Sequence, residues 1–285
     1  MSSLPETNGR ASTAQRRQRT RFMQRLLSAS WLAPTLVGVA AVILWDVLVR
    51  VTQTPPYILP GPGLVIKTLI AEWPDLFPSL LVTIQITLVA FLAAVVSGLL
   101  IAIVFTQSKW IERSFFPYAV ILQTTPIVAI APLIIIWLKN NTFLALVVCA
   151  WIVAFFPIVS NTTLGLNSAD HSLRNLFELY GASRWQTLLY LRLPAALPYF
   201  LGGLRISGGL ALIGAVVAEF VAGTGGARSG IAYQILMSSY NLQIPRMFAA
   251  LLMTTVLGVS IFVGLTLLSD RLLNQWHESA VRREN

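Results

Sequence analysis

Two ionisable residues, Arg205 and Glu219, lie inside an apolar stretch that is long enough to cross a bilayer. A charge near the centre of a membrane helix costs a few kcal/mol, so each residue needs a partner or a function. They are separated by about 21 Å along one helix and cannot pair with each other. For Arg205 we favour a side chain that reaches the membrane surface over a contact with solute. For Glu219 the sequence leaves open a structural hydrogen bond to a neighbouring helix and a place in a solute pathway or gate.

A second polar group, Gln123, Thr124 and Thr125, precedes Pro126 in another apolar stretch. A proline frees a backbone carbonyl, and a nearby Thr hydroxyl often satisfies the local backbone, so this group is consistent with a structural kink. Gln123 can also donate and accept hydrogen bonds, as binding of a small polar solute requires. We interpret Gln123, Thr124, Thr125 and Glu219 as candidate pathway residues.

The remaining reactive side chains do not form a recognisable catalytic or metal-binding set. Cys149 is the one cysteine, and the two histidines, His171 and His277, are too scattered for a metal site. The sequence contains no G-x-x-x-x-G-K-[ST] motif, so it is not predicted to bind ATP through a P-loop. We therefore expect no catalytic residue, no metal and no cofactor, and we place any energy source on another chain.

The elements that carry these residues are predicted from composition and apolar runs. Of the 285 residues, 56% are hydrophobic and only 11% are charged, against about 25% charged in soluble domains. Several runs reach the roughly 20 apolar residues that a helix needs to cross a bilayer. The sequence therefore predicts an all-α, polytopic membrane protein with helices at 33–50, 79–106, 114–138, 143–165, 199–222 and 247–269.

The distribution of basic residues predicts the orientation of these six helices. Of the 20 Lys and Arg residues, 14 lie on the side that carries both termini and five on the other side, with Arg205 inside a helix. The positive-inside rule then places both termini in the cytoplasm. The net charge of +9 is explained by these flanking positions, so we expect no nucleic-acid partner. Residues 1–30 and 276–285 are predicted to be cytoplasmic tails, the first of them disordered.

The predicted fifth span carries small residues at a spacing of four, namely Gly203, Ser207, Ala211 and Ala215. Small residues let two membrane helices approach closely. The pattern is compatible with packing inside one subunit and with a subunit interface.

The segment 166–198 is the longest predicted cytoplasmic connection. Leu173, Leu176, Phe177 and Tyr180 recur at helical spacing and predict one face of a short amphipathic helix. Gly181 interrupts this pattern, and a second short helix is expected to follow. The sequence therefore predicts two short helices that meet at a glycine.

The second short helix is marked by signals at both ends. Ser183 and Gln186 match a capping box at its start. Trp185, Leu188 and Leu189 repeat the apolar spacing, and Leu193-Pro194 is expected to stop the helix. Such a pair could rest on lipid headgroups or dock into a groove of a cytoplasmic partner.

The same segment carries a family resemblance. The spacing of Gly181, Leu191 and Leu193-Pro194 resembles the EAA loop of binding-protein-dependent ABC transporter permeases, whose signature is EAA-x3-G-x9-I-x-LP. Leu191 stands where isoleucine is usual, and the EAA triplet is replaced by NLF at residues 175–177.

The resemblance extends over residues 31–275 and is strongest for the nitrate/sulfonate/taurine branch. It rests on short segments in several predicted spans, namely YILPGP at 57–62, TP at 125–126, FFP at 155–157, GLRIS at 203–207 and AE at 218–219. The resemblance implies a MetI-like permease fold, one transmembrane domain over residues 31–275 and a place in the cytoplasmic membrane of a bacterial cell. It also implies import of a small solute, such as an anion of the nitrate, sulfonate or taurine kind.

The resemblance implies partners as well. Such permeases work with cytoplasmic P-loop ATPase subunits, an extracytoplasmic solute-binding protein and a second permease copy. The residues implied in ATPase coupling are Leu176, Phe177, Tyr180, Gly181, Trp185, Leu191, Leu193 and Pro194. A self-contained secondary transporter is the alternative, but that class usually shows internal repeats, and none is evident between the halves of this sequence.

Overall fold

The computed structural model describes residues 32, 34–223 and 229–273. All regular elements in this part of the chain are helical. The predicted tails, residues 1–30 and 276–285, lie outside the described residues. The chain divides after Ile66 into two compact units, which are described separately.

The first unit contains one apolar helix that is long enough to span a membrane. It runs over Pro34–Val51, which agrees with the span predicted at 33–50. An ion pair between Asp46 and Arg50, at 2.8 Å, joins successive turns near its end. The chain then turns through Gln53, which has a positive φ, and reaches α2, Pro62–Ala71, at the boundary between the units.

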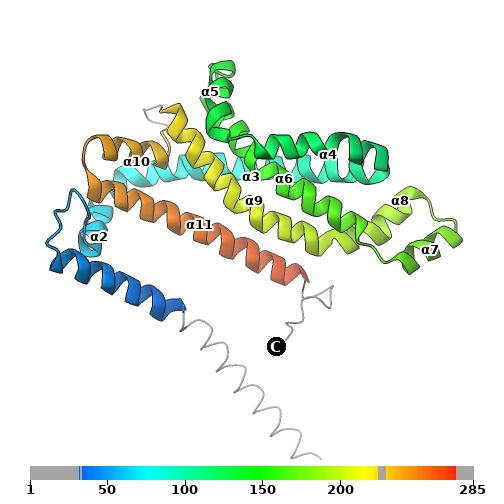
Figure 1. Cartoon of the computed structure of the whole chain (residues 1–285), viewed down its shortest axis with the longest axis horizontal. Helices are drawn as coiled ribbons and strands as arrows, with labels where there is room; N and C mark the ends of the chain where they lie inside the picture. The colour runs from blue at the N-terminus through cyan, green and yellow to red at the C-terminus, as the bar shows by residue number, and fades with distance from the viewer. Residues whose placement is uncertain (1–31, 33, 224–228, 274–285) are drawn as a thin grey trace, which may run out of the picture. The chain divides into compact units, whose positions relative to one another are not determined.

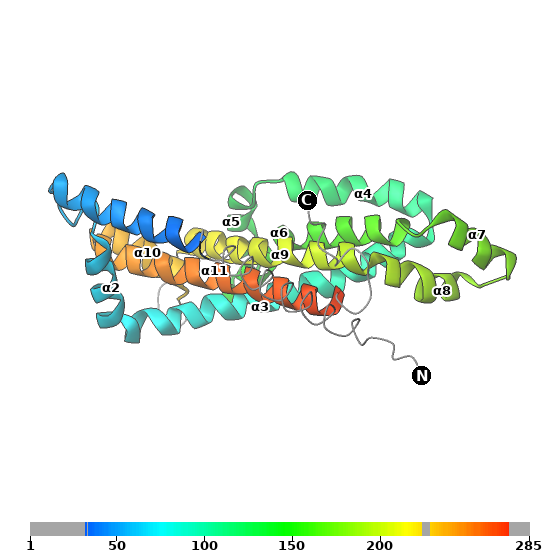
Figure 2. The same ribbon diagram turned by 90° about the horizontal axis from the view of Figure 1, so that it is seen from below.

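The second unit is a helical bundle (Figures 1 and 2). Its elements in chain order are α3 Trp73–Gln107, α4 Lys109–Thr124, α5 Ile127–Trp137, α6 Thr142–Asn167, α7 His171–Leu179, α8 Arg184–Thr187, a π-helical turn η1 Leu188–Arg192, α9 Leu193–Ala222, α10 Ile231–Tyr240 and α11 Ile244–Leu273. In both views α10 lies at one end of α9 and the α7–α8 pair lies at the other.

Helices α3, α6 and α9 form the core of this unit. Small side chains line their contacts, among them Ala90 and Ala94 on α3 and Ala150 on α6. On α9 the fully buried Ser207 donates a hydrogen bond to the carbonyl oxygen of Ala154 on α6, at 2.7 Å. Small residues let two helices approach until such contacts form. The row of small residues on α9 therefore packs inside one subunit.

The predicted spans are confirmed with one correction. By length and composition, the described residues include five continuous helices able to cross a membrane, in which α8, η1 and α9 form one helix. The predicted span at 114–138 is wrong as a single helix, because α4 and α5 meet at a bend of 96°. Thr125 is extended, with φ −70° and ψ 123°, because the ring of the following proline disfavours helical geometry at the residue before it.

Candidate functional site

The segment predicted to couple to an ATPase begins with a capped helix. The side chain of Asp170 accepts hydrogen bonds from the backbone N–H groups of Ser172, at 2.7 Å, and Leu173, at 3.3 Å. These donors, with that of Leu173 contributing most, lower the pKa of the Asp170 carboxyl below its ordinary value. A charged cap therefore fixes the start of α7.

The end of α7 is a glycine turn of the Schellman type. The N–H of Ala182 donates to the carbonyl oxygen of Phe177, at 2.9 Å, and the N–H of Gly181 donates to that of Glu178, at 3.0 Å. Gly181 has φ +66°, a left-handed conformation that side chains disfavour. Apart from its two chain neighbours, no described residue has an atom within 4 Å of a Cβ added at this position. Backbone conformation, and not close packing of the two short helices, is what requires glycine in this chain.

The second short helix starts as predicted but does not stop as predicted. Ser183 Oγ accepts from the N–H of Gln186, at 3.2 Å, and Gln186 Oε1 accepts from the N–H of Ser183, at 2.7 Å, which completes the capping box. The predicted stop at Leu193-Pro194 is wrong, because α8 continues through η1 into α9. The π-helical turn shifts the hydrogen bond of Leu193 to Leu188, and its wider backbone accommodates the ring of Pro194.

The predicted coupling residues divide into an exposed set and a buried set. Leu176, Tyr180 and Trp185 are exposed, at 45%, 83% and 67%, and Phe177 is half-buried. Leu191 is buried, and Leu193 packs against a cluster around Leu188 that joins the segment to α3 and α6. Pro194 is exposed. The buried set holds the segment on the bundle, and the exposed set presents an apolar surface, which also includes Leu179 at 84% exposure, a residue that the sequence pattern missed.

Glu219 lies at the centre of a buried polar cluster at the other end of α9. One of its carboxylate oxygens accepts a hydrogen bond from Thr83 Oγ1 on α3, at 2.7 Å, and the other accepts from the N–H of Ala232 on α10, at 2.9 Å. Thr83 Oγ1 also accepts from the N–H of Ile231, at 2.9 Å. The carboxylate and hydroxyl therefore satisfy the first two N–H groups of α10, a structural role that the sequence left open.

Helix α10 lies outside the six spans predicted from the sequence and follows a glycine-rich stretch at residues 223–230. Ile231, Ile235 and Ser238 are buried and recur at helical spacing, which is the signal that could have revealed it. Gln234 donates to Ser79 Oγ on α3 at 3.0 Å, and Arg246 on α11 donates to Gln234 at 3.4 Å. Polar contacts therefore join α10 to both neighbouring helices.

The other candidate pathway residues do not meet Glu219 in a common cluster. Thr124 and Thr125 both donate to the carbonyl oxygen of Ile121, at 3.1 and 2.8 Å, where α4 ends. Gln123 is exposed in the single chain. Arg205 forms an ion pair with Asp270 on α11, at 2.9 Å, so it has a partner on another helix.

Comparison with known proteins identifies the architecture. Residues 94–274, which include α7, the Gly181 turn and Glu219, match the family described as the binding-protein-dependent transport system inner membrane component. The chain belongs to this family. It is therefore a multi-pass permease subunit of an ABC importer, which explains a membrane protein without a P-loop of its own.

Three relatives illustrate the breadth of this permease family. The chain is 31% identical to the formylaminopyrimidine transport permease protein ThiX of Halalkalibacterium halodurans, over 85% of this chain and 95% of that protein. It is 33% identical to the riboflavin transport system permease protein RibX of Chloroflexus aurantiacus, over 83% and 87%. It is 30% identical to the putative aliphatic sulfonates transport permease protein SsuC of Bacillus subtilis, over 97% and 96%.

A solved structure shares the fold of the permease. This chain matches a chain of the structure titled "Crystal structure of an amino acid ABC transporter with histidines" with a TM-score of 0.58. The match covers 71% of this chain and 96% of that chain. The sequence identity is 20%, so the similarity concerns the fold alone.

Proposed function

We propose that the exposed apolar surface of α7 and α8 docks onto a separate P-loop ATPase subunit. The observation that carries this proposal is the combination of a rigid turn at Gly181 with exposed Leu176, Tyr180 and Trp185. A capped helix and a Schellman turn hold these side chains in place before a partner arrives, so little ordering entropy is lost on binding. Large aromatic side chains are the residue types that dominate protein interfaces.

The two sides of the membrane are part of the same proposal. The coupling segment, residues 166–198, and both termini face the cytoplasm, as the distribution of basic residues supports. Helix α10, at the opposite end of α9, faces an extracytoplasmic solute-binding protein (Figure 1). Two permease copies form the translocation unit, and ATP is hydrolysed on the partner chains.

The proposed solute is a small anion of the nitrate, sulfonate or taurine kind. Named relatives include a nitrate import permease protein of Synechococcus elongatus and a taurine transport system permease protein of Escherichia coli. The candidate pathway groups at the α4–α5 bend, Gln123, Thr124 and Thr125, offer neutral hydrogen bonds that suit a small polar solute. A nitrogen heterocycle is the second candidate, since the riboflavin and formylaminopyrimidine permeases are also relatives.

Two tyrosines allow a matched test of ATPase docking. Tyr180 on the coupling segment is 83% exposed, and Tyr240 at the end of α10 is 71% exposed. Loss of a large aromatic anchor from an interface costs about 2 kcal/mol, so Tyr180→Ala should weaken binding of the ATPase subunit about 30-fold. Tyr240→Ala should leave it unchanged. Both effects are measured as the amount of ATPase subunit that co-purifies with each variant, and Tyr180→Ala is also tested for ATP hydrolysis stimulated by loaded binding protein.

The alternative, in which α7 and α8 rest on lipid headgroups, makes a different prediction. Tyr180→Ala would then retain the ATPase subunit as the parent chain does.

The solute is tested separately, by adding binding protein loaded with taurine, nitrate or riboflavin to the reconstituted complex and measuring stimulated hydrolysis. Stimulation by riboflavin alone would contradict the anion assignment and leave the docking proposal intact.

A further inference from the structure

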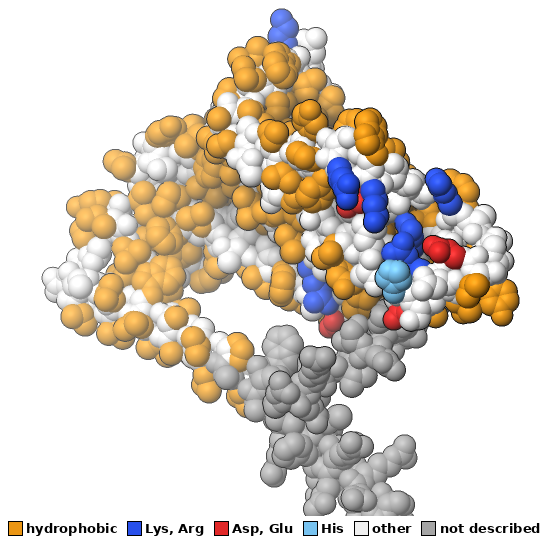
Figure 3. Space-filling view, turned by 45° about the vertical axis from the view of Figure 1, so that its right-hand side comes forward, with side chains coloured by type: hydrophobic (Ala, Val, Ile, Leu, Met, Phe, Trp, Pro, Cys, Tyr) orange, Lys and Arg blue, Asp and Glu red, His pale blue; other side chains and the backbone are white. Residues whose placement is uncertain are grey.

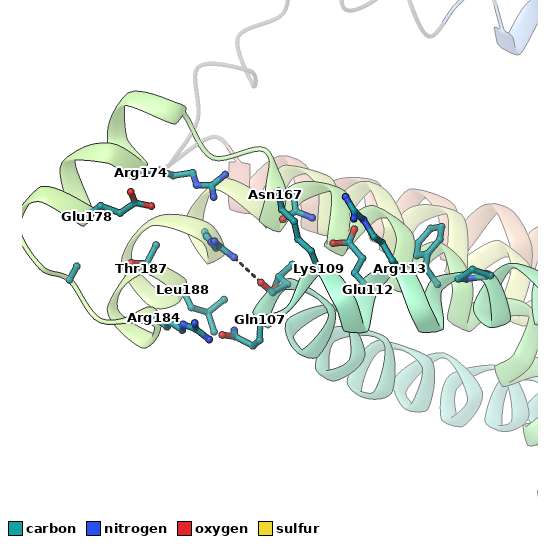
Figure 4. A pocket seen from close by; sticks show the side chains of 15 residues that line it. Gln107, Lys109, Glu112, Arg113, Asn167, Arg174, Glu178, Arg184, Thr187 and Leu188 are labelled. Atoms are coloured by element: carbon teal, nitrogen blue, oxygen red, sulfur yellow. Dashed lines mark hydrogen bonds between the residues drawn. The ribbon is translucent and has the colours of Figure 1, made fainter.

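A charged cleft lies beside the coupling segment and is separate from its apolar surface. It has a volume of about 850 Å³ and lies between the junction of α3 with α4 and the helices α7, α8 and η1 (Figure 4). Its basic lining residues are Lys109, Arg113, Arg174, Arg184 and Arg192. Among the residues that the structure describes, only two acidic ones, Glu112 and Glu178, line the same cleft. Basic groups from four elements, α4, α7, α8 and η1, therefore converge on one space.

The basic residues of the cleft have no carboxylate partner within 4.0 Å in the described part of the chain. Elsewhere in the same unit, Arg205 pairs with Asp270 and Arg246 with Glu72. Figure 3 shows blue side chains gathered around the end that carries α7 and α8, with smaller red patches among them. A cleft lined mainly by one sign of charge raises the local concentration of the opposite ion.

One of these cations is held in place by the backbone. Arg192 donates a hydrogen bond to the carbonyl oxygen of Thr106, at 3.0 Å, across the junction between η1 and the end of α3 (Figure 4). Arg174 on α7 and Lys109 on α4 enter from separate helices of the lining. An anion bound between them would bridge α4, α7 and η1. It would fix the coupling segment against the end of the bundle.

We propose that this cleft binds a phosphate-type anion. A guanidinium group matches the oxygens of phosphate through two parallel hydrogen bonds, and an ammonium group adds a compact charge. The apolar span of α3 ends at Gln107, directly beside the cleft, so the cleft lies where phospholipid headgroups meet water. Basic pockets between helices at this depth bind lipid headgroups. The phosphate comes either from an anionic phospholipid or from a soluble phosphate ion, and the site is independent of the identity of the transported solute.

The test uses the full chain in lipid nanodiscs. In the first arm the nanodiscs contain equal amounts of phosphatidylglycerol and phosphatidylcholine. Native mass spectrometry of the protein released from these nanodiscs reports which lipid it retains. Calorimetric titration of inorganic phosphate into phosphatidylcholine nanodiscs reports the soluble source. Lys109→Gln and Arg174→Gln remove one charge from each side of the cleft, and Arg271→Gln is the matched control on α11, outside the lining.

The proposal is supported if Lys109→Gln and Arg174→Gln each lower the measured binding about fivefold. The quantity measured is retention of phosphatidylglycerol in the first arm and binding of phosphate in the second. The double variant should lose about 25-fold, while Arg271→Gln should bind as the parent does. The arm that shows this loss identifies the source of the phosphate. The proposal is overturned if the parent binds neither anion, or if Arg271→Gln loses as much anion binding as the cleft variants do. It is also overturned if the cleft variants keep anion binding and lose only the ATPase subunit. Circular dichroism confirms that each variant retains its helices, and Lys109→Arg, which keeps the charge, should retain the anion.

Discussion

The hydroxyl group of Thr83 on α3 donates a hydrogen bond to the Glu219 carboxylate on α9 and accepts one from the N–H of Ile231 on α10. One threonine thus joins three helices. Ala232 supplies the second donor to Glu219, so the cluster fixes the start of α10 in two places. Since α10 has only ten residues, a helix that is marginal alone, its position depends on these contacts.

The first prediction follows from this arrangement. Thr83→Val keeps the volume of the side chain but leaves Glu219 and the N–H of Ile231 each short of one partner. The variant should be less stable by about 1–3 kcal/mol, since a buried polar group without a partner costs that much. The measurement is the thermal unfolding midpoint of the purified permease in detergent.

Thr87 supplies the matched control for this prediction. It lies one turn further along α3, is buried, and its hydroxyl has no hydrogen-bond partner among the residues that the structure describes. Thr87→Val should therefore leave the midpoint unchanged or raise it. Equal losses in both variants would mean that the hydroxyl of Thr83 contributes nothing specific.

The second prediction concerns Gly230, which precedes α10. A Cβ at this position would clash with the carboxyl group of Glu219, so any side chain must push the carboxylate away from its donors. Gly230→Ala should lower the thermal midpoint and reduce solute transport in reconstituted vesicles. Gly209→Ala, in the middle of α9 where a Cβ meets no atom within 4 Å, should be neutral or slightly stabilising. A Gly230→Ala permease with parental stability and transport would show that the cluster is not needed to position α10.

The role of Glu219 itself is tested by Glu219→Gln, the third prediction. Glutamine keeps the size of the side chain but offers one oxygen where the carboxylate uses two, so one donor on Thr83 or Ala232 loses its acceptor. A structural role predicts a lower thermal midpoint, with transport restored when the sample is cooled. A role in the pathway predicts normal stability and altered transport. Parental behaviour in both assays would reject both roles.

Much of this fold follows from periodicity, while contacts between distant segments do not. Apolar runs predicted the spans because the bilayer requires a minimum length of helix. The partner of Glu219 could not be predicted, because Thr83 is 136 residues away and nothing in its own sequence context marks it. The capping box at Ser183 was predictable because both of its residues lie within one turn. The predicted stop at Pro194 was wrong, because the π-helical turn that accommodates this proline has no simple sequence signal.

The fourth prediction concerns orientation. Ser168, after α6, and Ser239, on α10, are both exposed and lie at the two ends of the bundle. In a Cys149→Ala background, Ser239→Cys should react with an impermeant thiol reagent added to intact cells, and Ser168→Cys should react only after the membrane is opened. The reverse pattern would invert the proposed orientation. Labelling of both in intact cells would contradict the assigned spans.

The last prediction separates two reasons for a glycine at position 181. Its φ of +66° favours glycine, tolerates asparagine and disfavours alanine, whereas crowding against a bound ATPase subunit would penalise asparagine more than alanine, because asparagine is larger. We expect Gly181→Asn to retain the ATPase subunit nearly as the parent does. Gly181→Ala should weaken retention about fivefold, since the left-handed conformation costs a non-glycine residue about 1 kcal/mol. Gly181→Pro should abolish retention, because proline cannot reach this φ and lacks the N–H that bonds to Glu178. The measurement is the amount of ATPase subunit that co-purifies with each variant. A reversed order, with alanine better than asparagine, would show that space at the docked interface, and not the turn itself, determines the residue.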